Sequence, residues 1–130
     1  MMDRTGELLN KPYWIIDILP KRVQETSGGQ YFRIEKYFLA NQLDEIRQKH
    51  LNLILKLNCY IDISVNDEFN PAPEKIRNIM NKQDLCITAG NTVILSEHGD
   101  TYMTVFNPDK SFLKLIIQIA SGEGLFVWKP

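Results

Sequence analysis

The clearest pattern in this chain is an alternation of apolar and polar residues over positions 51–65. The odd positions from Leu51 to Val65 are all apolar, and the even positions are polar except for Ile54. This period of two is typical of a strand with one buried and one wet face, which antiparallel sheets allow. We therefore predict a long strand here. Extended, it would span roughly 50 Å, so it must bend, begin as the last turn of a preceding helix, or project towards a partner.

Shorter patterns precede this segment. Residues 13–19 are aromatic and β-branched and end at Pro20, which predicts a first strand. Residues 31–39 combine strand-like aromatic residues with a spacing that also fits a helix, and we favour a strand. Asn41 then predicts the cap of a short helix that runs to Lys49.

The second half of the chain has clearer boundaries. Pro73 begins a short helix, and three strands over 85–89, 92–96 and 101–106 form a β-meander through glycine-containing turns. A last helix follows, and its polar residues form one narrow stripe, so it should lie across the sheet. We predict Asn107 as its N-terminal cap and Gly122 as the left-handed residue that ends it. Residues 125–128 predict a closing strand.

These elements predict an α+β fold. We expect a largely antiparallel sheet of six or seven strands, one main helix packed on a face, and two short flanking helices. The 130 residues are one domain's worth of chain. We expect residues 1–12 to be a flexible N-terminal segment and residues 13–130 to form a single domain.

Composition and charge exclude several classes of protein. Lys and Arg number 15 against 16 Asp and Glu, so a net charge of −1 provides no field to attract nucleic acid. No apolar segment approaches the ~18 residues of a membrane helix, and the N-terminus does not resemble a signal peptide. Cys59 and Cys86 lie in apolar segments and are expected to be buried and reduced. We therefore expect a cytoplasmic protein without a membrane or nucleic-acid partner.

Motifs that would indicate catalysis are missing from the sequence. There is no phosphate-binding loop and no Gly-x-Ser-x-Gly turn for a nucleophilic serine. The histidines and cysteines do not occur at the paired spacings of zinc sites. We expect no metal and no cofactor, and the sequence does not favour an enzyme.

A few polar residues remain as candidates for binding. Four of them would form a row on the wet face of the long strand. Asp17 is a carboxylate in an otherwise apolar strand, where its pKa could be raised, and His98 lies between two acidic residues at a predicted hairpin tip. The row consists of Lys56, Asn58, Tyr60 and Asp62.

These observations leave two hypotheses for function. The first is a non-enzymatic cytoplasmic module that binds another protein or itself, as a homodimer, through the polar row. The alternative is a small-molecule-binding protein or weak enzyme with a pocket between the sheet and the C-terminal helix. In that case Asp17, Tyr60, Asp62 and His98 would be the residues to test.

Four segments of the chain also resemble those of a family of small uncharacterised bacterial proteins. The segments are WIIDILP (14–20), LILKLNCY (53–60), MTVFNP (103–108) and LFVWKP (125–130). The resemblance implies no activity, ligand or catalytic residue.

Overall fold

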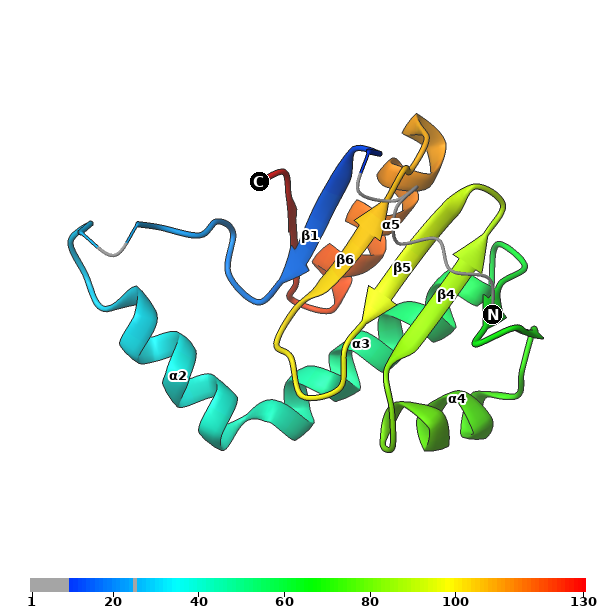
Figure 1. Ribbon diagram of the computed structural model, residues 1–130, viewed down its shortest axis with the longest axis horizontal. Coiled ribbons are helices and arrows are strands. Elements are labelled where there is room, and N and C mark those ends of the chain that lie inside the picture. The colour runs from blue at the N-terminus through cyan, green and yellow to red at the C-terminus, as the bar shows by residue number, and fades with distance from the viewer. Residues whose placement is uncertain (1–9, 25) are drawn as a thin grey trace.

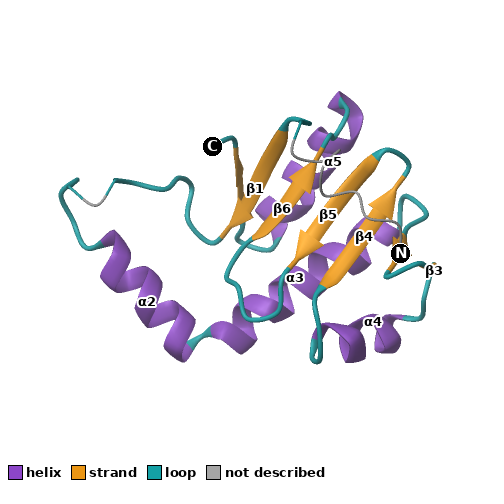
Figure 2. Ribbon diagram, in the orientation of Figure 1, coloured by secondary structure: helices purple, strands orange, loops and turns teal. Residues whose placement is uncertain are grey.

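The computed structural model describes residues 10–24 and 26–130. This part of the chain forms one open antiparallel sheet and four helices (Figure 1, Figure 2). The strands are β1 (Tyr13–Asp17), β2 (Ser64–Val65), β3 (Glu68–Phe69), β4 (Leu85–Ala89), β5 (Thr92–Ser96), β6 (Met103–Phe106) and β7 (Phe126–Trp128), in the spatial order β3-β2-β4-β5-β6-β1-β7. The helices are α2 (Tyr31–Asn41), α3 (Leu43–Asn58), α4 (Pro73–Met80) and α5 (Lys110–Gly122). The predicted α+β class and antiparallel sheet are confirmed.

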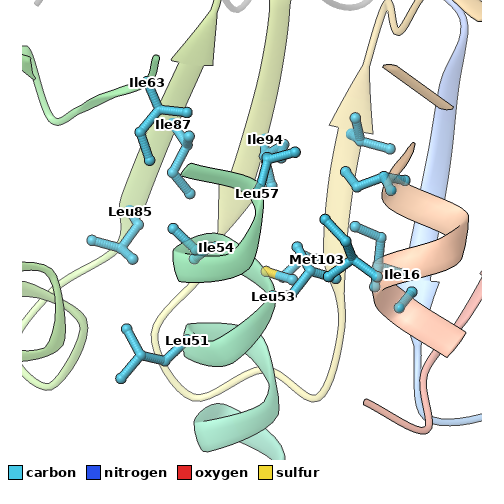
Figure 3. Close-up of a cluster of buried hydrophobic side chains, with 14 of the residues drawn as sticks. Ile16, Leu51, Leu53, Ile54, Leu57, Ile63, Leu85, Ile87, Ile94 and Met103 are labelled. Atoms are coloured by element: carbon cyan, nitrogen blue, oxygen red, sulfur yellow. The ribbon is translucent and has the colours of Figure 1, made fainter. Parts of the chain in front are cut away.

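One face of the sheet is covered by α3 and α5, which lie side by side behind it in Figure 1. The strand register aligns Val65, Ile87, Ile94 and Val105 in a single row across β2, β4, β5 and β6. These residues are buried and form one hydrophobic cluster with side chains of the two helices, part of which is drawn in Figure 3. The core is therefore a single layer between sheet and helices.

The long strand predicted over 51–65 is wrong. Residues up to Asn58 form the second half of α3, and only Ser64–Val65 are strand. The buried side chains Ile46, His50, Ile54 and Leu57 recur every three or four residues, as in a helix with one buried face. The alternation arises because α3 also contacts α4 and α5. Apolar residues therefore extend over more of its circumference than one stripe.

The predicted strand over 31–39 is also wrong, because this segment is α2. Asn41 is the last residue of α2 rather than a cap, and Gln42 alone separates α2 from α3. The chain thus has two helices where one short helix was predicted. The longer α3 shares the covered face of the sheet with α5.

The remaining predicted elements are confirmed, with one correction at α5. The first strand, the Pro73 helix, the meander and the closing strand are all present. However, the N-cap of α5 is Asp109, whose Oδ1 accepts a 2.8 Å hydrogen bond from the Phe112 amide. Asn107 instead adopts a left-handed backbone with φ of 58°. Gly122 is the last helical residue, and Gly124 has the positive φ.

The described helices include none that is both long and apolar enough to cross a membrane. Of the N-terminal segment expected to be flexible, residues 1–9 lie outside the described residues.

Candidate functional site

The four residues predicted as a row do not share a sheet face. Lys56 is exposed on α3 and forms an ion pair with Glu123, just beyond α5. Asn58 ends α3, and Tyr60 and Asp62 lie in the turn that follows it. Tyr60 is 71% exposed.

The turn after α3 brings two of these residues together through Asn70. The Asn70 side chain accepts hydrogen bonds from the Asn58 side chain and the Ile63 amide, and donates one to the Asp62 carboxylate, each 3.0 Å long. Asn70 itself has a left-handed backbone with φ of 42°. Asn58 and Asp62 therefore stabilise this turn. The predicted row on a strand face does not form, because its four residues lie on α3 and in the turn that follows α3.

Asp17 lies at the end of β1 and is buried, with 3% of the residue exposed. Its Oδ1 accepts a 2.7 Å hydrogen bond from the Ile18 amide. Burial, followed by repulsion from Glu35, raises the pKa of Asp17, while hydrogen bonding and Arg22 oppose the increase. The structure thus gives a physical cause for the pKa shift considered from the sequence.

The charged and polar groups around Asp17 come from the loop after β1 and from the start of α2. The Arg22 guanidinium lies 3.7 Å from Glu35 Oε2, and the Tyr31 hydroxyl donates a 3.3 Å hydrogen bond to the same oxygen. Burial, Glu35 and Asp17 together raise the pKa of Tyr31 to about 12. The Tyr31 phenol is therefore neutral near pH 7, and it donates its hydrogen bond to Glu35 within α2.

Beyond this anchor, α2 has little contact with the rest of the molecule. Figure 1 shows it standing apart from the sheet, and none of its residues is buried. Four large apolar side chains are exposed along its eleven residues. They are Phe32 (37% exposed), Ile34 (44%), Tyr37 (57%) and Leu39 (44%).

The helical spacing distributes the side chains of α2 over four sides. At about 3.6 residues per turn, the partly buried Tyr31, Glu35, Phe38 and Gln42 line the side towards the body. Phe32 and Leu39 fall on one flank, and Ile34 and Tyr37 fall on the opposite flank. Arg33 and Lys36 lie on the outward side. We call the two flanks and this outward side the α2 surface.

Sequence reasoning missed the α2 surface because residues 31–39 were assigned to a strand. The signal that could have identified it is the spacing of Tyr31, Ile34 and Phe38, which fits one side of a helix. What the sequence could not show is that the apolar side chains of the two flanks stay exposed among the described residues, with the Arg22 guanidinium 5.8 Å from the centre of the Phe32 ring.

His98 lies at the β5–β6 hairpin and lines a groove of about 440 Å³ together with residues of α3 and α4. Its ring Nδ1 lies 3.4 Å from the Met80 carbonyl, and its amide donates to Asp84. We call this space the α3–α4 groove. Two further grooves lie beside the start of α2 and along β4 near Asn66. None of these three occupies the predicted position between the sheet and α5.

Arg47, which lines the α3–α4 groove, is hydrogen-bonded to two buried polar residues, His50 and Ser96. The Arg47 Nη1 donates to Ser96 Oγ at 2.9 Å and to His50 Nδ1 at 3.1 Å. Because arginine cannot accept a hydrogen bond, this contact assigns the His50 proton to Nε2. Burial and the neighbouring Arg47 lower the pKa of His50 to about 3, so the imidazole is neutral near pH 7.

The described residues contain no group of three or more His, Cys, Asp or Glu side chains placed to hold a metal ion. Cys59 is exposed at the end of α3 and Cys86 is half-buried in β4. Cys59 therefore differs from the expectation of a buried thiol.

Comparisons with protein-family models, with curated protein sequences and with solved structures each found no significant match.

Proposed function

We propose that this chain is a non-enzymatic, cytoplasmic protein-interaction module that presents the α2 surface to another protein. The observation that carries the proposal is an eleven-residue helix with four exposed large apolar side chains and no buried residue. Helices shorter than ~12–15 residues are marginal in water unless they pack against something. A helix that is apolar around most of its circumference is typically enclosed in a larger core. A partner protein would provide that core.

The arrangement of side chains on α2 indicates the chemistry of the partner. Apolar residues on two opposite flanks require apolar walls on both sides of the helix. Arg33 and Lys36 on the outward side require carboxylates between these walls, because Glu35, the one acidic residue of α2, already pairs with Arg22. The partner therefore offers an apolar groove with acidic residues at its base, a common way of binding helices.

A second copy of this chain fits the α2 surface less well. Pairing α2 with α2 of another copy across a two-fold axis would cover one flank of each helix and leave the opposite flank in water. It would also bring the cationic sides of both helices close together. A groove in a different protein covers both flanks and neutralises Arg33 and Lys36. Cys59 and Cys86 are both thiols, which is consistent with a reducing, cytoplasmic setting for this interaction.

Site-specific photocrosslinking tests the proposal. A photoreactive phenylalanine analogue replaces Tyr37 on α2 or, as the matched control, the equally aromatic Tyr60 at the other end of α3. Each variant is expressed and irradiated in the cells that naturally make the protein. We expect one specific protein to be crosslinked from position 37 and not from position 60. Reversing the charge at Arg33 and Lys36 to Glu should reduce the crosslink at least tenfold.

Two results would overturn this proposal. Crosslinks from position 37 that join only copies of this chain would replace the foreign partner with self-association. The absence of any crosslink specific to position 37 would remove α2 as a contact surface.

A further inference from the structure

We infer that the α3–α4 groove binds a small organic oxyanion, a carboxylate or phosphate monoester carried on an apolar group. This site is separate from the α2 surface and does not depend on the function proposed for it. The groove has a volume of about 440 Å³ and lies where α3, α4 and the β5–β6 hairpin meet. Two arginines, Arg47 and Arg77, line it from different helices.

Arg47 supplies the main argument. Its Nη1 is held by Ser96 and His50, whereas its Nη2 is buried and has no hydrogen-bond partner among the residues described. Neither Ser96 nor the neutral His50 carries a negative charge. No carboxylate of the described chain lies within ion-pair distance of Arg47, although Asp100 and Asp84 attract it from farther away. A half-buried cation is therefore fixed in place with one donor group unsatisfied, which an oxyanion would correct.

Arg77 adds a second positive charge to the lining of the groove. Its guanidinium is exposed on α4 and makes no hydrogen bond or ion pair that involves the described residues. Arginine binds carboxylate and phosphate groups well because its planar guanidinium matches their pairs of oxygens. Two guanidinium groups from separate helices can therefore hold one oxyanion between them.

Among the side chains that line the groove, the cationic ones outnumber the anionic one. Asp44 also lines the groove, so its arginine and carboxylate side chains sum to a charge of +1. Asp84 and Asp100 do not line the groove and attract Arg47 from outside it, and Asp84 accepts a hydrogen bond from the His98 amide. Glu97 and Asp100 interact closely enough to raise the pKa of Glu97, mainly through their hydrogen bond.

The apolar part of the lining indicates what the oxyanion is attached to. Leu43, Leu51 and Met80 line the same space as the two arginines. Leu51 and Met80 are already buried in the core, whereas Leu43 is only half-buried, so a short alkyl or aryl group would cover Leu43 and an inorganic ion would not. Because Arg47 Nη2 is enclosed in this arrangement, a side chain of the groove wall must shift when the ligand enters.

Titration calorimetry with the whole chain tests this inference. The probes are hexanoate, hexyl phosphate, inorganic phosphate and, as an uncharged mimic of hexanoate, hexanamide, all in low-salt buffer. We expect hexanoate or hexyl phosphate to bind at least tenfold more tightly than hexanamide and inorganic phosphate. The two charged probes distinguish a carboxylate from a phosphate ligand.

Three variants locate the binding. Arg77→Gln should weaken binding of the preferred probe at least fivefold, and Arg47→Lys should do so while keeping the charge. Lys114→Gln, which removes an exposed cation on α5 that does not line the groove, should leave the affinity unchanged. Thermal unfolding of each variant confirms that it is folded, and amide chemical shifts of the wild-type chain should change mainly around the groove.

Several outcomes would overturn the inference. If no oxyanion binds at millimolar concentration, the Arg47 donor is satisfied by water alone. Equal binding of inorganic phosphate and hexyl phosphate would indicate an adventitious ion only. Equal losses in Arg77→Gln and Lys114→Gln would show that binding reflects net charge and not the groove. None of these results bears on the α2 surface, whose test uses different residues.

Discussion

His50 and Asp17 are buried titratable side chains whose pKa values move in opposite directions for the same physical reason. Burial penalises the charged form of each group, so the pKa of the base falls and that of the acid rises. Arg47 further disfavours a charged His50, and Glu35 further disfavours a charged Asp17. Each residue also has a polar contact that fixes its position: Arg47 on His50, and the Ile18 amide on Asp17.

The lowered pKa of His50 predicts a loss of stability in acid. Below about pH 6.5 the unfolded chain binds a proton at this histidine that the folded chain cannot bind until about pH 3. The free energy of unfolding therefore falls as the pH drops through this window, by up to ~1.4 kcal/mol per pH unit from this residue. His50→Gln should remove this part of the slope. Denaturant unfolding at pH 7, 6, 5 and 4 measures it.

The exposed His98 provides the control for this measurement. His98→Gln also removes one histidine, but from the exposed hairpin, and the acid slope should change less in this variant than in His50→Gln. An unchanged slope in His50→Gln would contradict a neutral buried imidazole.

At the scale of elements, α3 shows how the same residues can satisfy two patterns. Leu51, Leu53, Leu55 and Leu57 alternate as in a strand, but α3 is covered on more than one side and buries several of them as a helix. Ile54 was the exception to the alternation and is fully buried. The helical form also fits the molecule, because sixteen residues rise only about 24 Å as a helix.

Two neighbouring residues of α3 distinguish the helix from the strand by stability. Ile54 is fully buried and Leu55 is half-buried, so Ile54→Ala should lower the free energy of unfolding by about 2–5 kcal/mol. Leu55→Ala should cost clearly less. A strand over 51–65 would bury Leu55 and expose Ile54, and would give the reverse order. Chemical denaturation of both variants decides between them.

At the scale of the whole molecule, the chain consists of a packed body and one helix that adds little to its core. The body buries its apolar residues between the sheet and the pair α3 and α5. The Arg22–Glu35 ion pair attaches the start of α2 to the loop that follows β1, and Gln42 links its end to α3. The α2 surface therefore has the character of a contact region and not of a structural support.

This division predicts that α2 can be altered without loss of the fold. The double variant Ile34→Ser and Tyr37→Ser removes one apolar flank, and should change the free energy of unfolding by less than about 1 kcal/mol because exposed substitutions usually have small effects. The same variant should no longer bind the partner captured from position 37. Thermal and denaturant unfolding supply the first measurement, and calorimetry with the purified partner supplies the second.

Phe69→Ser removes an apolar side chain of similar exposure from β3 and serves as the matched control. It should alter neither quantity substantially. A loss of several kcal/mol in the α2 variant would show instead that α2 belongs to the core.

The sequence alone determined the α+β class, the β-meander, the Pro73 helix and the closing strand, because these elements carry local signals. Proline and glycine at their ends and the apolar residues between them are enough to define them. The candidate sites could not be predicted in this way. Asn58 and Asp62 were expected to form a recognition surface, and the tertiary structure instead joins them to Asn70 in a turn.

Only the tertiary structure decided the identity of residues 31–39 and 51–58, because there two periodicities fit the same residues. Packing resolves that ambiguity: neighbours on several sides of α3 stabilise it as a helix, and α2 follows from its link to α3. The exposure of the α2 flanks and the unsatisfied Arg47 donor are also properties of the folded chain. Both depend on which residues are not covered, and that is set by contacts between segments far apart in the sequence.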